Sequence, residues 1–263
     1  MATTGLKAQD VTTTDGQTYL NSSIRRSGEQ FFIKVMVPGG TGSMEMGIPL
    51  ARIAKVSFPE PPELVKAKAA AAKGYAAEVL SLTSDSVAKQ AELKDLPGSW
   101  WPELARLRLL ALVSEGKNSE SAELARQMGV VKSPLMESLS RSGTLFTSFC
   151  ASDLQAVLVG AKALPRIGGG EGSALAQFVL GKALLLKKDY PGALRAFLTI
   201  KVFYPSVALL QPAAMMGSYE AYVGVKDQKR ASQTLEDIVK DWPDSPQAPD
   251  ASKKQKILQA PQT

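Results

Sequence analysis

One recurring pattern of small, large and proline residues constrains the fold of this chain more than any other feature. Ala193, Phe197 and Pro205 are followed 38 residues later by Ala231, Leu235 and Pro243. A small residue lets two helices approach closely, a large residue one turn later fills the space between them, and a proline ends the second helix. The pattern therefore predicts stacked helix pairs, each burying its apolar face against its neighbours.

This pattern resembles the second half of a tetratricopeptide repeat, whose helix pairs stack into a superhelix. In the best-matching unit, Leu180 and Gly181 stand where that family has its Leu-Gly pair. The resemblance covers about residues 100–245 and departs from the family pattern over residues 135–165, where Asp153 replaces the alanine. It implies three or four stacked helix pairs, one of them irregular.

In that family the first helix of each pair lines a concave groove that binds partners. The resemblance places six candidate partner-binding residues there: Leu175, Phe178, Lys182, Leu185, Met216 and Glu220. The lysine and asparagine with which some members of the family hold a C-terminal carboxylate are missing from these positions. The implied partner is therefore a protein or peptide with an apolar or helical segment.

Two interpretations of Phe178 and Met216 remain open. These residues lie 38 positions apart and so occupy matching places in consecutive units. If both side chains are exposed in the groove, replacing them with serine leaves the stability of the fold unchanged. If the neighbouring repeat or the C-terminal tail covers them, they are part of the core.

Three other features have both a functional and a structural interpretation. Cys150 lies among apolar residues and is expected to pack as a small apolar group rather than act as a redox thiol. Trp100 and Trp101 form either an exposed aromatic anchor or the packed start of the next helix. The run RIGGGEG has no Gly-Lys-Ser/Thr and carries Glu171 where a phosphate-binding loop needs positive charge, so we expect a flexible joint before a helix capped by Ser173.

The region over residues 8–58 has the short, punctuated apolar runs of a β module. Asp15–Gly16, Ser27–Gly28 and Gly39–Gly40 mark turns, and four or five strands of this length predict a small SH3-like or Sm-like barrel. Prolines at positions 59, 61 and 62 end the region, and Pro62 can begin a helix.

The stretches TTTDGQTYLNSSIRR and GIPLARIAKVSFPEPPEL resemble a small β module of exported bacterial proteins, common in the Verrucomicrobia and their relatives. The resemblance covers about a fifth of the chain. It implies a periplasmic or secreted setting, with a leader removed ahead of the first residues; a cytoplasmic setting is the alternative. No run approaches the roughly 18 apolar residues of a membrane-spanning helix.

Together these patterns predict an α+β multidomain protein in four parts. They are an SH3/Sm-like β-barrel module over residues 8–58, a Pro-rich boundary and Ala-rich helical connector over 59–98, an all-α tetratricopeptide-like superhelix over 99–246, and a polar, disordered tail over 247–263. Within the connector, Ser84 or Asp85 is placed to cap a second helix.

Composition narrows the function classes. The chain has no histidine and one cysteine, which excludes imidazole bases, His-containing zinc sites and thiolate metal clusters, and no cofactor is predicted. The net charge is +6, but the basic residues are interspersed with acidic ones. The leading hypothesis is a non-enzymatic scaffold or adaptor of a bacterial envelope. The alternatives are a nucleic-acid-associated adaptor with an Sm-like barrel and a carboxylate-based enzyme with its site between the two parts.

Overall fold

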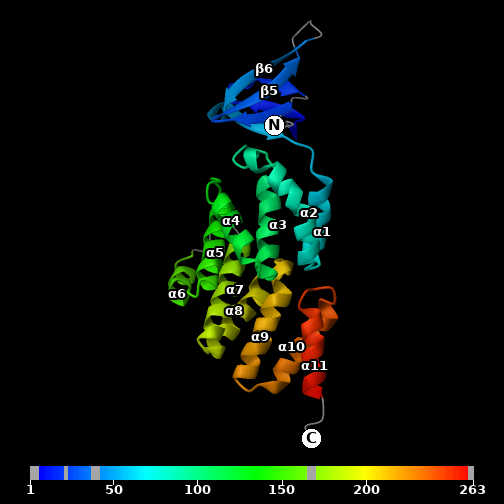
Figure 1. Cartoon of the computed structure of the whole chain (residues 1–263), viewed down its shortest axis with the longest axis vertical. Coiled ribbons are helices and arrows are strands. Elements are labelled where there is room, and N and C mark those ends of the chain that lie inside the picture. The colour runs from blue at the N-terminus through cyan, green and yellow to red at the C-terminus, as the bar shows by residue number, and fades with distance from the viewer. Residues whose placement is uncertain (1–5, 21–22, 37–41, 165–169, 260–263) are drawn as a thin grey trace. The chain divides into compact units, whose positions relative to one another are not determined.

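The computed structural model describes residues 6–20, 23–36, 42–164 and 170–259 (Figure 1). The chain divides into two compact units, residues 1–65 with 85–104 and residues 66–84 with 105–263. Strands lie in the N-terminal part, and the helices begin at Pro62. The predicted α+β organisation, a small β module followed by helices, is therefore confirmed.

Short strands in the first unit form two antiparallel sheets, with the orders β1-β4-β5-β6 and β3-β2-β7. The strands are β1 (Leu6–Lys7), β2 (Asp10–Thr13), β3 (Thr18–Leu20), β4 (Ser23–Ser27), β5 (Gln30–Met36), β6 (Ser43–Pro49) and β7 (Ile53–Ser57). The predicted turns at Asp15–Gly16 and Ser27–Gly28 join β2 to β3 and β4 to β5, and both glycines have positive φ. The predicted turn at Gly39–Gly40 lies outside the described residues, between the paired strands β5 and β6.

The predicted closed barrel is wrong, because the described strands form two sheets that share one core. A 3-10 turn at Leu50–Arg52 separates β6 from β7 and carries the chain from one sheet to the other. Phe31 and Ile33 of the first sheet are buried together with Val11 and Val56 of the second. Both sheets therefore bury one face against each other, as in a small sandwich.

A later segment of the chain completes this core. Leu93, at the end of the 3-10 turn η2 (Ala91–Leu93), and Leu96 are buried in the same cluster as the strand residues. The N–H of Val56 on the edge strand β7 donates to the carbonyl of Pro97 at 2.8 Å. The sequence boundary at residue 58 therefore leaves out part of the β unit, because these contacts join residues far apart along the chain.

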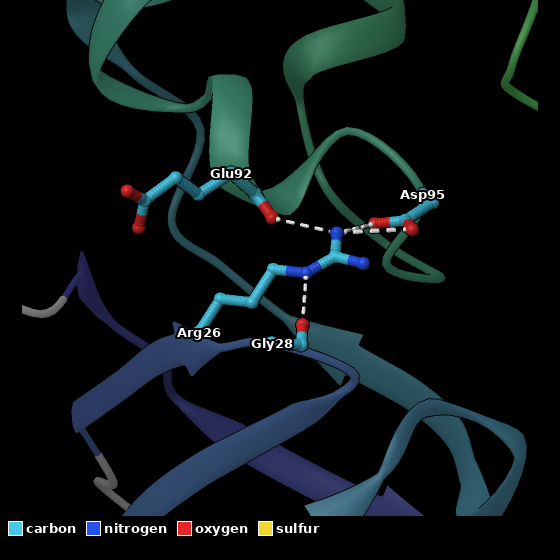
Figure 2. A network of polar contacts seen from close by, with 4 residues as sticks. All are labelled: Arg26, Gly28, Glu92 and Asp95. Carbon is cyan, nitrogen blue, oxygen red and sulfur yellow. Dashed lines mark hydrogen bonds and ion pairs between the residues drawn. The ribbon is translucent and has the colours of Figure 1, made fainter.

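Arg26 on β4 binds the segment around Glu92 and Asp95 through polar contacts (Figure 2). The Nη1 atom of Arg26 donates to both carboxylate oxygens of Asp95, at 2.8 and 3.0 Å, and to the backbone carbonyl of Glu92 at 3.2 Å. Its Nε atom donates to the carbonyl of Gly28 at 2.9 Å. Figure 2 shows the Glu92 carboxylate turned away, so only its backbone takes part.

Eleven α-helices are present among the described residues. They are α1 (Pro62–Ala72), α2 (Ala76–Lys89), α3 (Trp101–Ser114), α4 (Asn118–Met128), α5 (Pro134–Cys150), α6 (Leu154–Ala163), α7 (Gly170–Leu186), α8 (Tyr190–Phe203), α9 (Gln211–Gly224), α10 (Gln228–Asp241) and α11 (Ala248–Gln259). Pro62 begins α1 as predicted, but α2 runs through Ser84 and Asp85, so the predicted cap there is wrong. The helix break lies earlier instead, at Gly74, whose positive φ turns the chain between α1 and α2.

The two adjacent tryptophans are packed rather than exposed as an anchor. Trp101, the first residue of α3, is buried. The indole Nε1 of Trp100 donates to the carbonyl of Phe58 at 3.1 Å. Of the two sequence interpretations, the packed helix start is the one that the structure supports.

Five helix pairs turn from one helix to the next through the same backbone conformation. The residues with positive φ, between 59° and 73°, are Gly74, Gly116, Ser152, Lys188 and Lys226. In each turn the following residue donates its N–H to the carbonyl five positions earlier, as Asp189 does to Leu184 at 3.0 Å. These are the bonds of a Schellman motif, which satisfies carbonyls at the helix end. The turn positions recur every 36 to 42 residues.

The small and large positions of the repeat pattern are buried between helices. Ala193 and Phe197 on α8 are both inaccessible to solvent, and a Cβ atom added to Gly181 on α7 would lie 2.7 Å from the Phe197 ring. Figure 1 shows α7, α8, α9, α10 and α11 following one another side by side, in agreement with their contacts. The predicted joint between the two helices of the pair is therefore present.

The glycine run belongs to a tightly packed helix start where it is described. Helix α7 begins at Gly170, so Ser173 lies inside the helix and does not cap it. A Cβ atom on Gly172 would lie 2.0 Å from the Ser138 hydroxyl of α5. The hydroxyl of Ser142 donates to the carbonyl of Gly172 at 2.8 Å. Residues 165–169 lie outside the described residues. Gly172 thus allows α5 and α7 to approach closely, whereas the predicted flexible joint falls on residues that are not described and stays a prediction.

The C-terminal segment is helical over residues 248–259, so the predicted disordered tail is wrong there. Ala248 and Ala251 of α11 are buried, and Ala251 packs in the cluster that contains Leu235 and Ile238 of α10. Two alanines give too weak an apolar signal to identify this face from sequence. Among the described residues, no helix is long and apolar enough to cross a membrane.

Candidate partner-binding cavity

A cavity of about 540 Å³ lies among the first helices of four successive pairs. Residues of α3, α5, α7 and α9 line it, together with the turn between α3 and α4, Asn118 at the start of α4, and Gln247. All of these residues belong to the second unit. We call this space the groove cavity. Its volume lies in the range of about 300–1,000 Å³ that is typical of ligand pockets.

Four of the six residues predicted for the groove line this cavity: Phe178, Lys182, Met216 and Glu220. On α7 the lining continues at Leu186. This residue lies four positions after Lys182 and therefore on the same helix face, and it is 61 % exposed. Leu175 is fully buried and Leu185 is half-buried, and neither is among the lining residues.

Phe178 and Met216 are nevertheless core residues. They are only 4 % and 9 % exposed, respectively. The Phe178 ring meets the ring of Phe197 edge to face at 6.1 Å between centroids, and Met216 packs in the cluster of Leu235 and Ile238. The interpretation with both side chains exposed is therefore wrong. Both line the cavity with a small part of their surface while the neighbouring helices cover the rest.

Aromatic rings and a thiol form the wall contributed by α5. The rings of Phe146 and Phe149 stack with their centroids 6.4 Å apart, and Cys150 follows them at the end of the helix. The thiol is free, and burial raises its pKa. Cys150 is half-buried in the cavity lining, a setting that makes the thiolate less available at neutral pH, and its packing as a small apolar group stays a prediction.

Two buried acceptors in the cavity lining have no hydrogen-bond partner among the described residues. They are the Oε1 atoms of Glu115, in the turn after α3, and of Gln247, in the segment before α11. The amide nitrogen of Gln247 makes a long contact of 3.5 Å with the carbonyl of Ser114. Leaving a buried acceptor unsatisfied costs about 1–3 kcal/mol, so these atoms favour a guest or water that donates to them.

The sequence could not identify these two residues as neighbours. Glu115 and Gln247 lie 132 positions apart, and neither matches a groove position of the repeat pattern. The segment that carries Gln247 is held near the first helix pair, where the hydroxyl of Tyr75 donates to Asp244 at 2.6 Å. The same hydrogen bond raises the pKa of Tyr75.

The described residues of the second unit also line two further cavities. One, of about 540 Å³, lies between α6, α7 and α8, and its lining includes Lys162, Lys187 and Arg195. The other, of about 180 Å³, lies beside the ion pair between Arg106 and Glu171. Neither contains a residue predicted for the groove, and the described part of the chain holds no cluster of three metal-ligating side chains.

Comparisons of the chain with protein-family models, with curated proteins and with solved structures each found no match.

Proposed function

We propose that this protein is a non-enzymatic binding scaffold, in which a tetratricopeptide-like array of helix pairs holds a protein or peptide partner in the groove cavity. The observation that carries this proposal is the position of the cavity on the first helices of four successive pairs. Its lining combines aromatic walls with a few polar groups, the composition typical of binding pockets. The turns that recur every 36 to 42 residues support the comparison with repeat scaffolds.

The proposed setting is the bacterial envelope, and this rests on the resemblance of the β module to exported proteins. Fractionation of native cells tests it directly. The alternative of a nucleic-acid adaptor is less well supported, since it relied on an Sm-like barrel and the described strands form two sheets instead.

The proposed binding surface can be tested with a matched pair of substitutions. Leu186 lines the cavity and is 61 % exposed, whereas Phe203, near the end of α8, is 71 % exposed and is not among the lining residues. Both can be changed to serine, and each should alter the free energy of unfolding by no more than about 0.5 kcal/mol. Phe178 and Met216 are unsuitable, because truncating a buried side chain costs about 2–5 kcal/mol.

The full chain and both variants are used to capture partners by crosslinking in native extract. We expect Leu186→Ser to lose the partner that the parent chain captures and Phe203→Ser to retain it. Retention by Leu186→Ser, or loss only in Phe203→Ser, would place the binding surface outside the groove cavity and end the proposal.

A further inference from the structure

The polar groups of the groove cavity are unbalanced in favour of acceptors. The buried Oε1 atoms of Glu115 and Gln247 are unpartnered among the described residues, and Glu220 adds a second carboxylate. Lys182 carries the one positive charge among the described lining residues. The pKa of Lys254 is raised chiefly by its hydrogen bond to Asp250 and least by Glu220, and this lysine is already paired with Asp250 at 2.8 Å. The cavity thus offers more sites for N–H donors than it fills itself.

Helix ends add to the negative potential. Helices α3, α5 and α7 end at Ser114, Cys150 and Leu186, and all three residues line the cavity. Each helix C-terminus carries a partial negative charge of roughly half an elementary charge. Three such ends and two carboxylates outweigh the single ammonium group of Lys182.

The apolar walls are suited to the stem of a long basic side chain. Phe146, Phe149 and Phe178 provide aromatic surface from two helices. Lysine and arginine bury their methylene stems against such surfaces, and their cationic heads are attracted by aromatic faces. Arginine and lysine also supply several N–H donors and no acceptor, which complements the two unpartnered oxygens.

We propose that the partner held in the groove cavity is an apolar protein segment that inserts a lysine or arginine side chain, whose cationic head donates to Glu115 and Gln247. This inference rests on the proposed function and specifies the partner of the same site. The cavity between α6 and α8 has the opposite character, with Lys162, Lys187 and Arg195 in its lining, and does not fit such a guest.

Three small probes of similar shape test the charge requirement. They are 4-phenylbutylamine, which is cationic, 4-phenyl-1-butanol, which is neutral, and 4-phenylbutyrate, which is anionic. Binding to the full chain is followed through the methyl signal of labelled Met216, which lines the cavity, with buried Met128 and Met136 as internal references. We expect the amine to shift the Met216 signal with an affinity about tenfold higher than that of the alcohol, and the carboxylate to bind least.

Substitutions of opposite sign sharpen the test. Glu115→Gln should weaken amine binding about fivefold, and Lys182→Gln should strengthen it, because each removes one charge at the cavity. Glu137→Gln, on an exposed position of α5 outside the lining, is the matched control and should change nothing. Thermal unfolding of each variant establishes that the fold is intact.

Each outcome decides the inference separately from the proposed function. Equal binding of amine and alcohol, preferred binding of the carboxylate, or no effect of Glu115→Gln overturns the cationic guest while leaving the groove proposal in place. If no probe shifts Met216, the inference also fails. Partner capture with the Leu186 and Phe203 variants then decides the proposed function on its own.

Discussion

The ring of Phe197 on α8 lies so close to Gly217 on α9 that a Cβ atom at position 217 would be 2.4 Å from the ring's Cζ atom. Phe197 is almost fully buried, so its ring has no free space to move into. Gly217→Ala should therefore destabilise the protein by about 1–3 kcal/mol through overpacking. Urea unfolding of the full chain measures this.

A double substitution shows whether the ring itself is the cause. Phe197→Leu replaces the aromatic ring with a smaller branched aliphatic group and should restore space for the new methyl group. The combined cost of Gly217→Ala and Phe197→Leu should then be clearly smaller than the sum of the two single costs. Additive costs would mean that Gly217 is required for another reason.

Two glycines with similar backbone conformations should respond very differently to alanine. Gly98 has φ of 93°, and a Cβ atom there would lie 1.8 Å from the carbonyl oxygen of Val56, whereas Gly116 has φ of 70° and open space around it. Gly116→Ala should cost about 1 kcal/mol, the penalty of the left-handed region alone. Gly98→Ala should cost at least about 2 kcal/mol more, because the backbone must also move. Equal urea midpoints for the two variants would contradict the contact with Val56.

The repeat pattern predicted the helix pairs because its spacing is local and strongly periodic. The burial of Ala193 and Phe197, and the face formed by Phe178 and Lys182, follow from positions within one or two helices. These parts of the fold and of the cavity could be read from residue spacing alone.

The remaining parts depend on contacts that spacing does not encode. Leu93 joins the core of the β unit although Val56, the nearest buried strand residue of that cluster, lies 37 positions earlier. Glu115 and Gln247 line the same cavity although they are 132 positions apart. The left-handed turn residues Lys188 and Lys226 gave no sequence signal either, because lysine has no preference for that conformation.

Cys150 provides a chemical test of the cavity wall. Burial raises the pKa of its thiol, so at a given pH a smaller fraction is thiolate than for a free cysteine. We expect alkylation by iodoacetamide near neutral pH to be severalfold slower than in the denatured chain. The rate should increase with pH, and the midpoint of this increase should lie at a higher pH than in the denatured chain. Alkylation as fast and as pH-dependent as in the denatured chain would contradict this placement. Bound 4-phenylbutylamine should slow the reaction further.

Two turns of the helix pairs contain a residue type that disfavours their backbone conformation. Lys188 and Lys226 have φ of 59° and 63°, in the left-handed region that costs a non-glycine residue about 1–2 kcal/mol. Glycine removes this penalty but gains entropy in the unfolded chain, which offsets about 0.5–1 kcal/mol. Lys188→Gly and Lys226→Gly should therefore each stabilise the protein by roughly 0.5–1 kcal/mol.

The neighbouring lysine supplies the control for this prediction. Lys187 lies in the same turn with an ordinary negative φ, so Lys187→Gly gains no relief and should destabilise the protein by about 0.5–1 kcal/mol. The two turns at 188 and 226 belong to different helix pairs, so their effects should add, and the double variant should melt a few degrees higher, at about 2–4 °C per kcal/mol. If Lys188→Gly and Lys187→Gly lower the melting temperature equally, the left-handed turn at position 188 is wrong, and with it the common geometry assigned to the five helix pairs.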